Sequence, residues 1–263
     1  MAESKNGKHF VLVHGAGGGS WVWYKVKQRL EAAGHRVTVV DLAASGQHPK
    51  AFHEVHTFKE YNEPLMEVMS LLEENEKIIL VGHSLGGINL ALAMEIYPQN
   101  ISAAVFVTAV LPDTLHHPSY IFEKLIEISP KDIGVDNQFS WEETINGPIM
   151  WVHFGPKYLA SKIYNLSPAE DLELGKILYR PASFFVADLA KTKKFTDEKY
   201  GSVNRVYIVC DNDNIVTEDF QRWTIEFSGI KDVIEINGSD HMPMTSKPHE
   251  LCHHLIEVAN KYT

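Results

Sequence analysis

The most constraining feature of this chain is an apolar run that leads into a Gly-x-Ser-x-Gly sequence centred on Ser84. The run, residues 78–81, is typical of a strand buried on both faces of a parallel sheet. Residues 88–95, rich in Leu, Ala and Met, predict a helix. Gly82 and Gly86 suit a tight turn between the two, because a Cβ there would clash. Strand, glycine turn and helix in this order predict a nucleophile elbow that presents Ser84 Oγ at the end of the strand.

The same motif also occurs in ordinary strand-to-helix turns, so the rest of the chain has to decide its meaning. Five further segments predict buried strands, and helical patterns separate most of them: 9–13, 36–40, 103–110, 203–210 and 232–236. Two of those helical patterns cover about 22–33 and 58–74. This alternation predicts an α/β fold with a mostly parallel, doubly wound sheet.

Residues 112–194 break the alternation. The segment is rich in aromatic side chains and contains a helical pattern at 168–178, but it has no strand of the parallel kind. We expect a cap, or lid, inserted in a core formed by residues 1–111 and 195–263. Its aromatic residues either wall an apolar pocket over Ser84 or form the cap's own core.

Charge and composition restrict the partners. The net charge of −10 disfavours nucleic acid, and no apolar run is long enough to span a bilayer. The polar N-terminus does not resemble a signal peptide, and two cysteines do not make a disulfide framework. These features predict a cytoplasmic protein without a nucleic-acid or membrane partner.

A serine nucleophile needs a base and an orienting acid, which in such folds follow it along the chain as Asp or Glu and then His. Asp213 comes after the predicted strand 203–210, with Asp211 as the second choice. The alternative is a purely structural role, in which these aspartates only form a turn. His241 comes after the last predicted strand, and no other histidine of the chain follows a terminal strand in this way. We therefore predict Ser84, Asp213 and His241 as the catalytic residues.

The oxyanion formed by attack on an ester needs aimed N–H donors. Leu85, directly after Ser84, supplies one, and Ala16 in the glycine-rich loop 14–19 is the predicted second. Such a loop could instead bind a dinucleotide, with Asp41 on the ribose. The spacing departs from that motif, since Ser20 stands where its third glycine is needed.

Several segments together resemble the plant methylesterase family, which includes methyl salicylate and methyl jasmonate esterases, polyneuridine aldehyde esterase and hydroxynitrile lyases. They are FVLVHGA at 10–16, VGHSLGG at 81–87, YIVC at 207–210 and DHM at 240–242, with further likeness at 63–67, 154–157 and 200–203. The resemblance implies an α/β-hydrolase fold with a cap. It matches Ser84, Asp213 and His241 to the family's triad, and Ala16 and Leu85 to its oxyanion donors. It also implies a small-molecule ester as substrate, no cofactor or metal and, in many members, a homodimer.

The chain departs from the family pattern at the oxyanion loop, where Gly17, Gly18, Gly19 and Ser20 replace a bulkier sequence, and at Asn214 and Thr217 after the acid. The cap stretch 140–146 is also unusual. These departures favour a specialised substrate, such as an alkaloid methyl ester, over a common hormone ester. The residues expected to contact the substrate are Gly15, His83, Trp141 and Met242.

The resulting hypothesis is a serine esterase that cleaves a methyl ester of a plant metabolite, with loss of carbon dioxide to follow if the product is a β-carbonyl acid. One alternative is a hydroxynitrile lyase. By the resemblance, the best-known lyases carry lysine at the position of Met242 and threonine at that of Gly15, and others carry asparagine at the latter. A second alternative is a hormone receptor on the same fold with little turnover.

Overall fold

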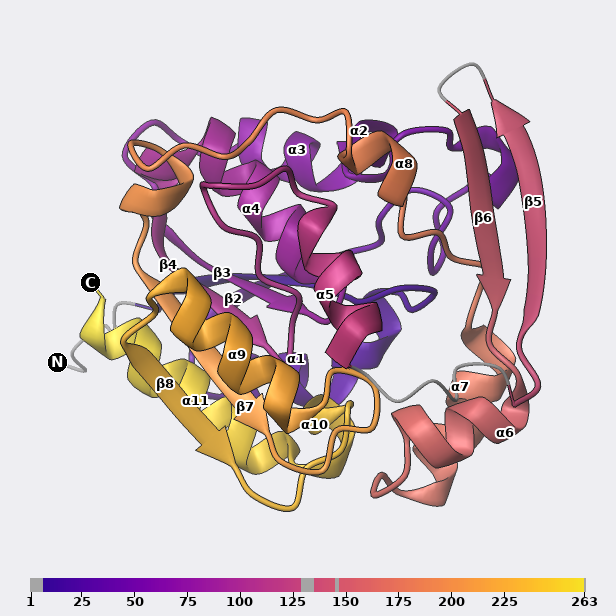
Figure 1. Cartoon of the computed structure of the whole chain (residues 1–263). Helices are drawn as coiled ribbons and strands as arrows, with labels where there is room; N and C mark the ends of the chain where they lie inside the picture. Colours follow the sequence, from indigo (N-terminus) through magenta and orange to yellow (C-terminus); the bar gives the residue numbers. More distant parts are fainter. Residues whose placement is uncertain (1–6, 129–134, 145–146, 263) are drawn as a thin grey trace, which may run out of the picture.

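The computed structural model describes residues 7–128, 135–144 and 147–262. Six strands form one sheet in the spatial order β2-β1-β3-β4-β7-β8, and every neighbouring pair is parallel (Figure 1). The strands are β1 (His9–Val13), β2 (Arg36–Val40), β3 (Ile78–His83), β4 (Ile101–Val107), β7 (Arg205–Cys210) and β8 (Asp232–Ile236). The predicted parallel, doubly wound sheet is confirmed, and all six strands lie outside residues 112–194.

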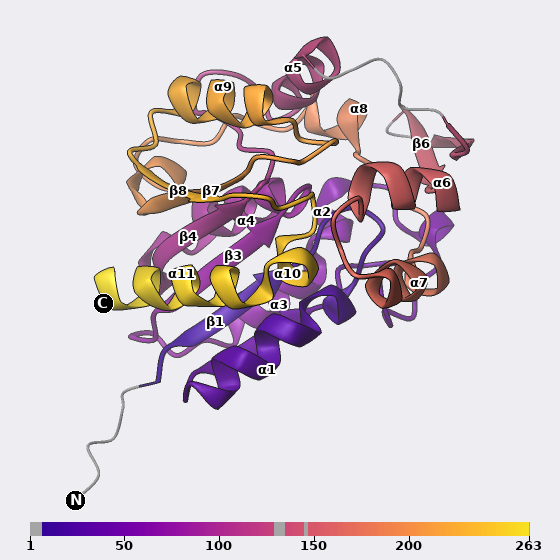
Figure 2. The same ribbon diagram turned by 90° about the horizontal axis from the view of Figure 1, so that it is seen from below.

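Helices cover both faces of this sheet (Figure 2). One face carries α1 (Tyr24–Ala32) and α11 (Pro248–Lys261), and the other carries α3 (Glu63–Ser70), α4 (Gly86–Ile96) and α9 (Glu218–Ser228). In β1, Phe10 and Leu12 pack on the first face, while Val11 packs on the second. A strand buried on both faces needs apolar residues throughout, which explains the unbroken apolar runs. The remaining core elements are short: η1 (Ser20–Trp23), η2 (Phe52–Glu54), α2 (Phe58–Tyr61), η3 (Pro98–Asn100), η5 (Tyr200–Ser202) and α10 (Pro243–Ser246).

The order of the strands places a switch point between β1 and β3. The chain moves outward from β1 to β2 and then crosses back to β3, so α1 and α4 lie on opposite faces. In open α/β sheets, ligands bind outside the carboxyl ends of the strands at such a point. The glycine loop after β1 and Ser84 after β3 both lie there.

Between β4 and β7 the chain forms the segment that was predicted as a cap. Its elements are α5 (Tyr120–Ile128), β5 (Gln138–Thr144), β6 (Gly147–His153), α6 (Pro156–Tyr158), the π-helical turn η4 (Leu159–Ile163), α7 (Ala169–Leu178) and α8 (Val186–Leu189). Strands β5 and β6 pair antiparallel and stand apart from the main sheet (Figure 1). The sequence analysis did not predict this hairpin.

Two predicted boundaries were wrong. The helix expected over 58–74 is two helices that meet at Asn62, because Pro64 in the first turn of α3 cannot donate the backbone hydrogen bond that would continue α2, and α3 itself ends at Ser70. Proline has no N–H and so cannot continue a preceding helix. The strand expected to reach residue 110 ends at Val107, since Thr108 adopts a positive φ of 37°.

Candidate active site

Ser84 sits in a strained turn at the end of β3. Its φ of 53° is in the left-handed region, which is uncommon for a residue other than glycine and costs free energy. A Cβ on Gly82 would approach Leu90 Cδ1 to 2.5 Å, and one on Gly86 would approach His14 O to 2.9 Å. Both glycines are therefore required by close packing around the turn, as the sequence analysis inferred. Ser84 itself is partly exposed, between neighbours that are buried.

The glycine loop after β1 approaches Ser84 closely. A Cβ on Gly15 would lie 2.8 Å from Ser84 Cβ, so any side chain there would press on the serine. Gly17 has φ +69°, and its carbonyl oxygen accepts a 2.8 Å hydrogen bond from Arg180 N, which ties the loop to the segment between β4 and β7. Among the described residues, neither the Ala16 nor the Leu85 N–H donates a hydrogen bond to a protein acceptor. Both amides therefore remain available for the predicted oxyanion role.

The dinucleotide alternative for this loop gains no support. Asp41 Oδ1 accepts from Ser20 N at 2.5 Å, and its Oδ2 accepts from Gln47 N at 3.2 Å. A Cβ on Gly19 would lie 2.5 Å from Gly46 Cα. The glycines and the aspartate therefore serve to pack the loop 14–20 against the loop that follows β2.

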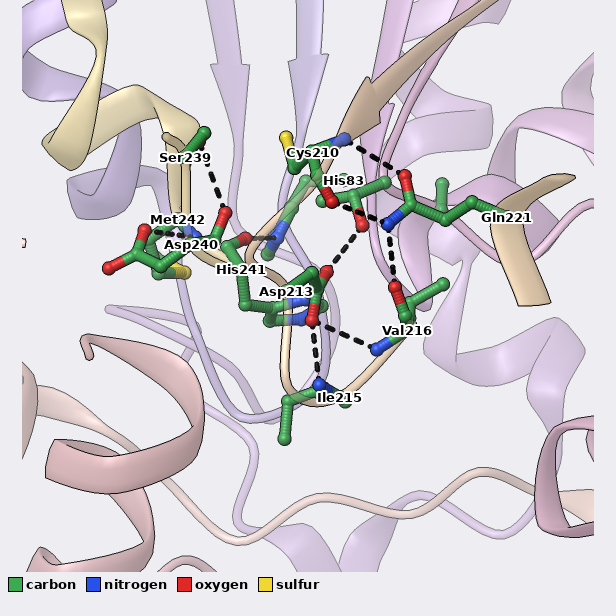
Figure 3. A network of polar contacts seen from close by, with 12 residues as sticks. His83, Cys210, Asp213, Ile215, Val216, Gln221, Ser239, Asp240, His241 and Met242 are labelled. Atoms are coloured by element: carbon green, nitrogen blue, oxygen red, sulfur yellow. Dashed lines mark hydrogen bonds and ion pairs between the residues drawn. The ribbon is translucent and has the colours of Figure 1, made fainter. Parts of the chain in front are cut away.

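Asp213 and His241 meet at the ends of β7 and β8 (Figure 3). His241 Nδ1 lies 2.6 Å from Asp213 Oδ2, and both side chains are buried. The other carboxylate oxygen, Oδ1, accepts from Ile215 N at 2.7 Å and from Val216 N at 3.0 Å. Thr108 Oγ1 donates to Oδ2. Three donors besides His241 thus fix the carboxylate, which in turn orients the imidazole so that its Nε2 points away from Asp213.

Asp211 has a different place. Its Oδ1 accepts from Gly238 N at 2.7 Å and from Ser239 N at 3.3 Å, so it braces the loop that carries His241 without contacting the imidazole. Burial tends to raise the pKa of Asp211, but the hydrogen bonds from Asn212, Gly238 and Ser239 outweigh it and lower the pKa. Within the described chain, Ser84 Oγ makes no hydrogen bond to His241. Such bonds are often long before a substrate is bound.

Two buried histidines, His83 and His14, stabilise the loops around Ser84 through backbone hydrogen bonds. The His83 Nε2–H donates to His241 O at 2.6 Å, and the two rings lie 4.6 Å apart. Burial lowers the pKa of His83 well below its usual value, and the nearby His241 lowers it further, so His83 is neutral. His14 lies under the glycine loop, with Nδ1 donating to Gly15 O at 2.7 Å and Nε2 accepting from Leu42 N at 3.1 Å. Burial lowers its pKa too.

Three residues that hold this site, Thr108, Gln221 and Asp240, are not predicted from the sequence. Thr108 lies inside what looked like a continuous apolar strand. Gln221 on α9 is fully buried and braces the Asp213 loop, accepting from Cys210 N at 3.0 Å and donating to Cys210 O at 2.9 Å and Val216 O at 2.7 Å (Figure 3). Asp240 accepts from Leu166 N at 2.9 Å and so links the segment between β4 and β7 to the His241 loop. A polar residue in an apolar run or on the inner face of a helix was the only available signal.

Gln221→Met is expected to lower the melting temperature by on the order of 10 °C. Methionine has a similar volume but leaves three buried backbone groups unpaired, at about 1–3 kcal/mol each, and 1 kcal/mol corresponds to a few degrees in a chain of this size. Differential scanning calorimetry measures the shift, with Gln99→Met on the exposed surface as the matched control. A shift of less than about 2 °C would show that Gln221 does not hold the loop.

A cavity of about 230 Å³ opens onto Ser84. Its lining is mainly apolar and includes Leu85, Phe122, Leu125, Phe139, Phe154 and Tyr158. Lys162 is the one lysine or arginine in this lining within the described ranges, and the sequence analysis did not single it out. The cavity suits a small, mostly uncharged molecule.

The four predicted substrate contacts lie at different places relative to the Ser84 cavity. Gly15 adjoins Ser84, and His83 and Met242 are buried, but none of the three lines the Ser84 cavity. Trp141 is 68% exposed on β5 and lies outside the Ser84 cavity. Trp141 lines a neighbouring cavity instead, because it lies on a hairpin that the alternation of strands and helices does not predict.

Residues 7–128, 135–144 and 147–262 contain neither a cluster of metal-binding side chains nor a membrane-spanning helix. No group of three or more His, Cys, Asp or Glu side chains in that part of the chain could hold a metal ion. None of its helices has the length and apolar character needed to cross a bilayer.

The fold and this arrangement of residues at the strand ends define an α/β-hydrolase. The model of the alpha/beta hydrolase family matches residues 10–254, so the chain belongs to that family. The crystal structure of polyneuridine aldehyde esterase superposes with a TM-score of 0.94 at 49% identity, covering 97% of this chain and 100% of the other.

Relatives match the chain over nearly its whole length and include an esterase and a lyase. Salicylic acid-binding protein 2 of Nicotiana tabacum is 53% identical over 258 residues, which cover 98% of this chain and 99% of the relative. Polyneuridine aldehyde esterase of Rauvolfia serpentina is 49% identical over 259 residues, or 98% of each chain. An alpha-hydroxynitrile lyase of Arabidopsis thaliana is also 49% identical, over 254 residues that cover 97% of this chain and 98% of the lyase. The resemblance to plant methylesterases is therefore confirmed.

Proposed function

We propose that this protein is a serine carboxylesterase that hydrolyses a methyl ester of a plant small molecule. The observation that carries the proposal is the buried His241–Asp213 pair, 2.6 Å apart, at the same sheet edge as the strained Ser84 turn. Esterases and methylesterases among the relatives support it.

In the proposed mechanism, Ser84 Oγ attacks the ester carbonyl carbon while its proton passes to His241 Nε2. Asp213 holds the opposite nitrogen, Nδ1, so that Nε2 is free to accept. The Leu85 and Ala16 N–H groups stabilise the negative oxygen. Methanol leaves with the proton from His241, and an acyl-enzyme forms. A water molecule, deprotonated by His241, then releases the carboxylic acid and restores the serine.

The apolar cavity favours a substrate whose acid part is largely hydrocarbon or aromatic, such as an indole alkaloid ester. The relatives named for alkaloid chemistry, polyneuridine aldehyde esterase and norfluorocurarine synthase 2, support this class. A β-carbonyl acid released in the site could then lose carbon dioxide. We further propose that the protein is cytoplasmic and forms a homodimer, as the resemblance to the plant methylesterase family implies.

The second candidate is a hydroxynitrile lyase. One relative carries that name, and Lys162 supplies a cation in the cavity lining. A lyase must stabilise departing cyanide, an anion, in an apolar pocket, and a cation beside the base can do so. The residue after His241 is Met242, which is buried and uncharged. This arrangement favours the esterase.

We therefore expect acid release from methyl esters and no appreciable cyanide release from mandelonitrile. The panel should include methyl salicylate, methyl jasmonate and indole alkaloid methyl esters, with the Ser84→Ala protein as blank. Cyanide release that depends on Ser84 and is faster than acid release from every ester would show that the protein is a hydroxynitrile lyase and not an esterase. In that event Lys162→Met should abolish cyanide release, since it removes the cation.

A further inference from the structure

A second cavity, of about 340 Å³, lies next to the Ser84 cavity. The two share three lining residues, Met150, Phe184 and Val186. A side chain that lines two cavities lies between them, so we call these three residues the partition. The partition consists of apolar side chains, and methionine in particular changes shape at low cost through its three rotatable bonds.

One face of the β5–β6 hairpin extends over both cavities. Residues directly opposite each other in an antiparallel pair, and residues two apart on one strand, point to the same face. Phe139 pairs with Val152, and Trp141 pairs with Met150, so all four side chains share a face. Phe139 and Val152 line the Ser84 cavity, Met150 lines both, and Trp141 lines only the second cavity. The hairpin therefore forms one continuous wall from Ser84 outward.

Residues 184–190 follow the same course along another wall. Phe184 and Val186 belong to the partition, and Ala187 and Ala190 line only the second cavity. Phe184 is fixed from the catalytic side by an edge-on contact with Phe122, whose ring centre lies 5.6 Å away. Two segments that are separate in sequence thus connect the same two cavities.

The size and chemistry of the second cavity suit an apolar ligand. Pockets for drug-sized ligands usually measure about 300–1,000 Å³, and the Ser84 cavity of about 230 Å³ is smaller than this range. The two volumes together fall inside it. Most of the wall of the second cavity is apolar, with Trp141, Phe185 and Ile149 in it, although the polar side chains of His56, Glu123 and Asp188 also line it. The Asp188 carboxylate accepts a hydrogen bond from Phe58 N at 2.8 Å. The large exposed ring of Trp141 at its edge is surface that a bound ligand would cover.

We propose that the second cavity binds the distal, apolar part of the substrate's acid group, and that Met150, Phe184 and Val186 determine how far that group can extend from Ser84. The inference rests on the proposed ester hydrolysis. It identifies the substrates as methyl esters of acids whose hydrocarbon or aromatic body is longer than the Ser84 cavity. A methyl ester needs little space on its alcohol side, so both cavities are available to the acid.

The first test compares a long substrate, methyl 6-phenylhexanoate, with a short one, methyl phenylacetate, as the ratio of their kcat/KM values. Ala187→Trp fills the second cavity from its exposed edge and should lower the long-to-short ratio by about tenfold, the effect of losing one or two buried methylenes. Ala32→Trp at the exposed end of α1 is the matched control and should leave the ratio unchanged. An equal loss of kcat/KM for both esters would show that the second cavity is only an entrance and does not bind the acid group, which would overturn the inference. An unchanged ratio in Ala187→Trp would make it a surface hollow without a role.

The second test opens the partition. Met150→Ala should raise the long-to-short ratio, and so should Leu125→Ala, which enlarges only the Ser84 cavity. In proteins that already carry Ala187→Trp, Met150→Ala should no longer raise the long-to-short ratio, whereas Leu125→Ala should still raise it. If both gains survive, the partition does not lead to the second cavity and the inference is overturned.

Binding measurements separate this inference from the proposed function. Calorimetry on the Ser84→Ala protein gives the affinity ratio of 6-phenylhexanoate to phenylacetate without turnover. If Ala187→Trp lowers that ratio but no ester is hydrolysed, the second cavity stands and the esterase proposal fails. If esters are hydrolysed through Ser84 but neither ratio responds, the esterase stands and the second cavity is rejected.

Discussion

Ser84→Ala is expected to reduce kcat for ester hydrolysis by roughly 10⁴-fold or more while the protein stays folded. The serine contributes the attacking oxygen, and the residues around it act as a unit, so no neighbour can compensate. Alanine keeps the Cβ that Gly15 packs against, so the turn loses only the hydroxyl. The left-handed φ of 53° is retained at a cost similar to that for serine.

The measurement is acid release from the best methyl ester of the panel, with melting temperature as the control for folding. Ser70→Ala, on the exposed part of α3, is the matched substitution and should leave turnover unchanged. Activity of Ser84→Ala within tenfold of the wild type would remove Ser84 as the nucleophile. Weak wild-type turnover, together with ligand or partner binding that survives Ser84→Ala, would instead favour the receptor alternative.

The parts of the fold that could be predicted are those in which local sequence and burial agree. Strands β1 and β3 were found nearly residue for residue, because a strand covered on both faces must be apolar almost throughout. The same order of strands placed Ser84, Asp213 and His241 at one edge of the sheet. The turn glycines also followed from sequence, since Gly82 and Gly86 have no room for a Cβ.

What could not be predicted depends on contacts between distant segments. Thr108 looked like one more strand residue, and only the folded chain shows its hydroxyl on Asp213. Gln221 is eleven residues from Cys210, and its role appears only when α9 packs beside β7. The hairpin β5–β6 pairs outside the main sheet, so the alternation that indicates parallel strands gave no signal for it. The position of Trp141 depended on that hairpin.

Asp213→Asn is expected to reduce kcat by about 10⁴-fold, far more than Asp211→Asn. The reason lies in the orientation of the side chain. Ile215 N and Val216 N both donate to Oδ1, so the asparagine carbonyl oxygen must take that place. Its NH₂ group then replaces Oδ2 and faces His241 Nδ1. Two donors cannot face each other, so the imidazole must carry its proton on Nε2, where it can no longer accept the proton of Ser84.

Asp211→Asn lacks this consequence, because an amide oxygen at Oδ1 can still accept from Gly238 N and Ser239 N. We expect a loss of no more than about tenfold, of the kind that follows from a slightly loosened loop. Both variants should be compared by kcat on one methyl ester, with melting temperatures alongside. Because the two aspartates lie on the same turn, a general disturbance of the turn would lower both activities alike. A larger loss in Asp211→Asn than in Asp213→Asn would show that Asp211 is the catalytic acid. A large loss in Asp213→Asn beside a small one in Asp211→Asn is the result that follows from the tautomer of His241.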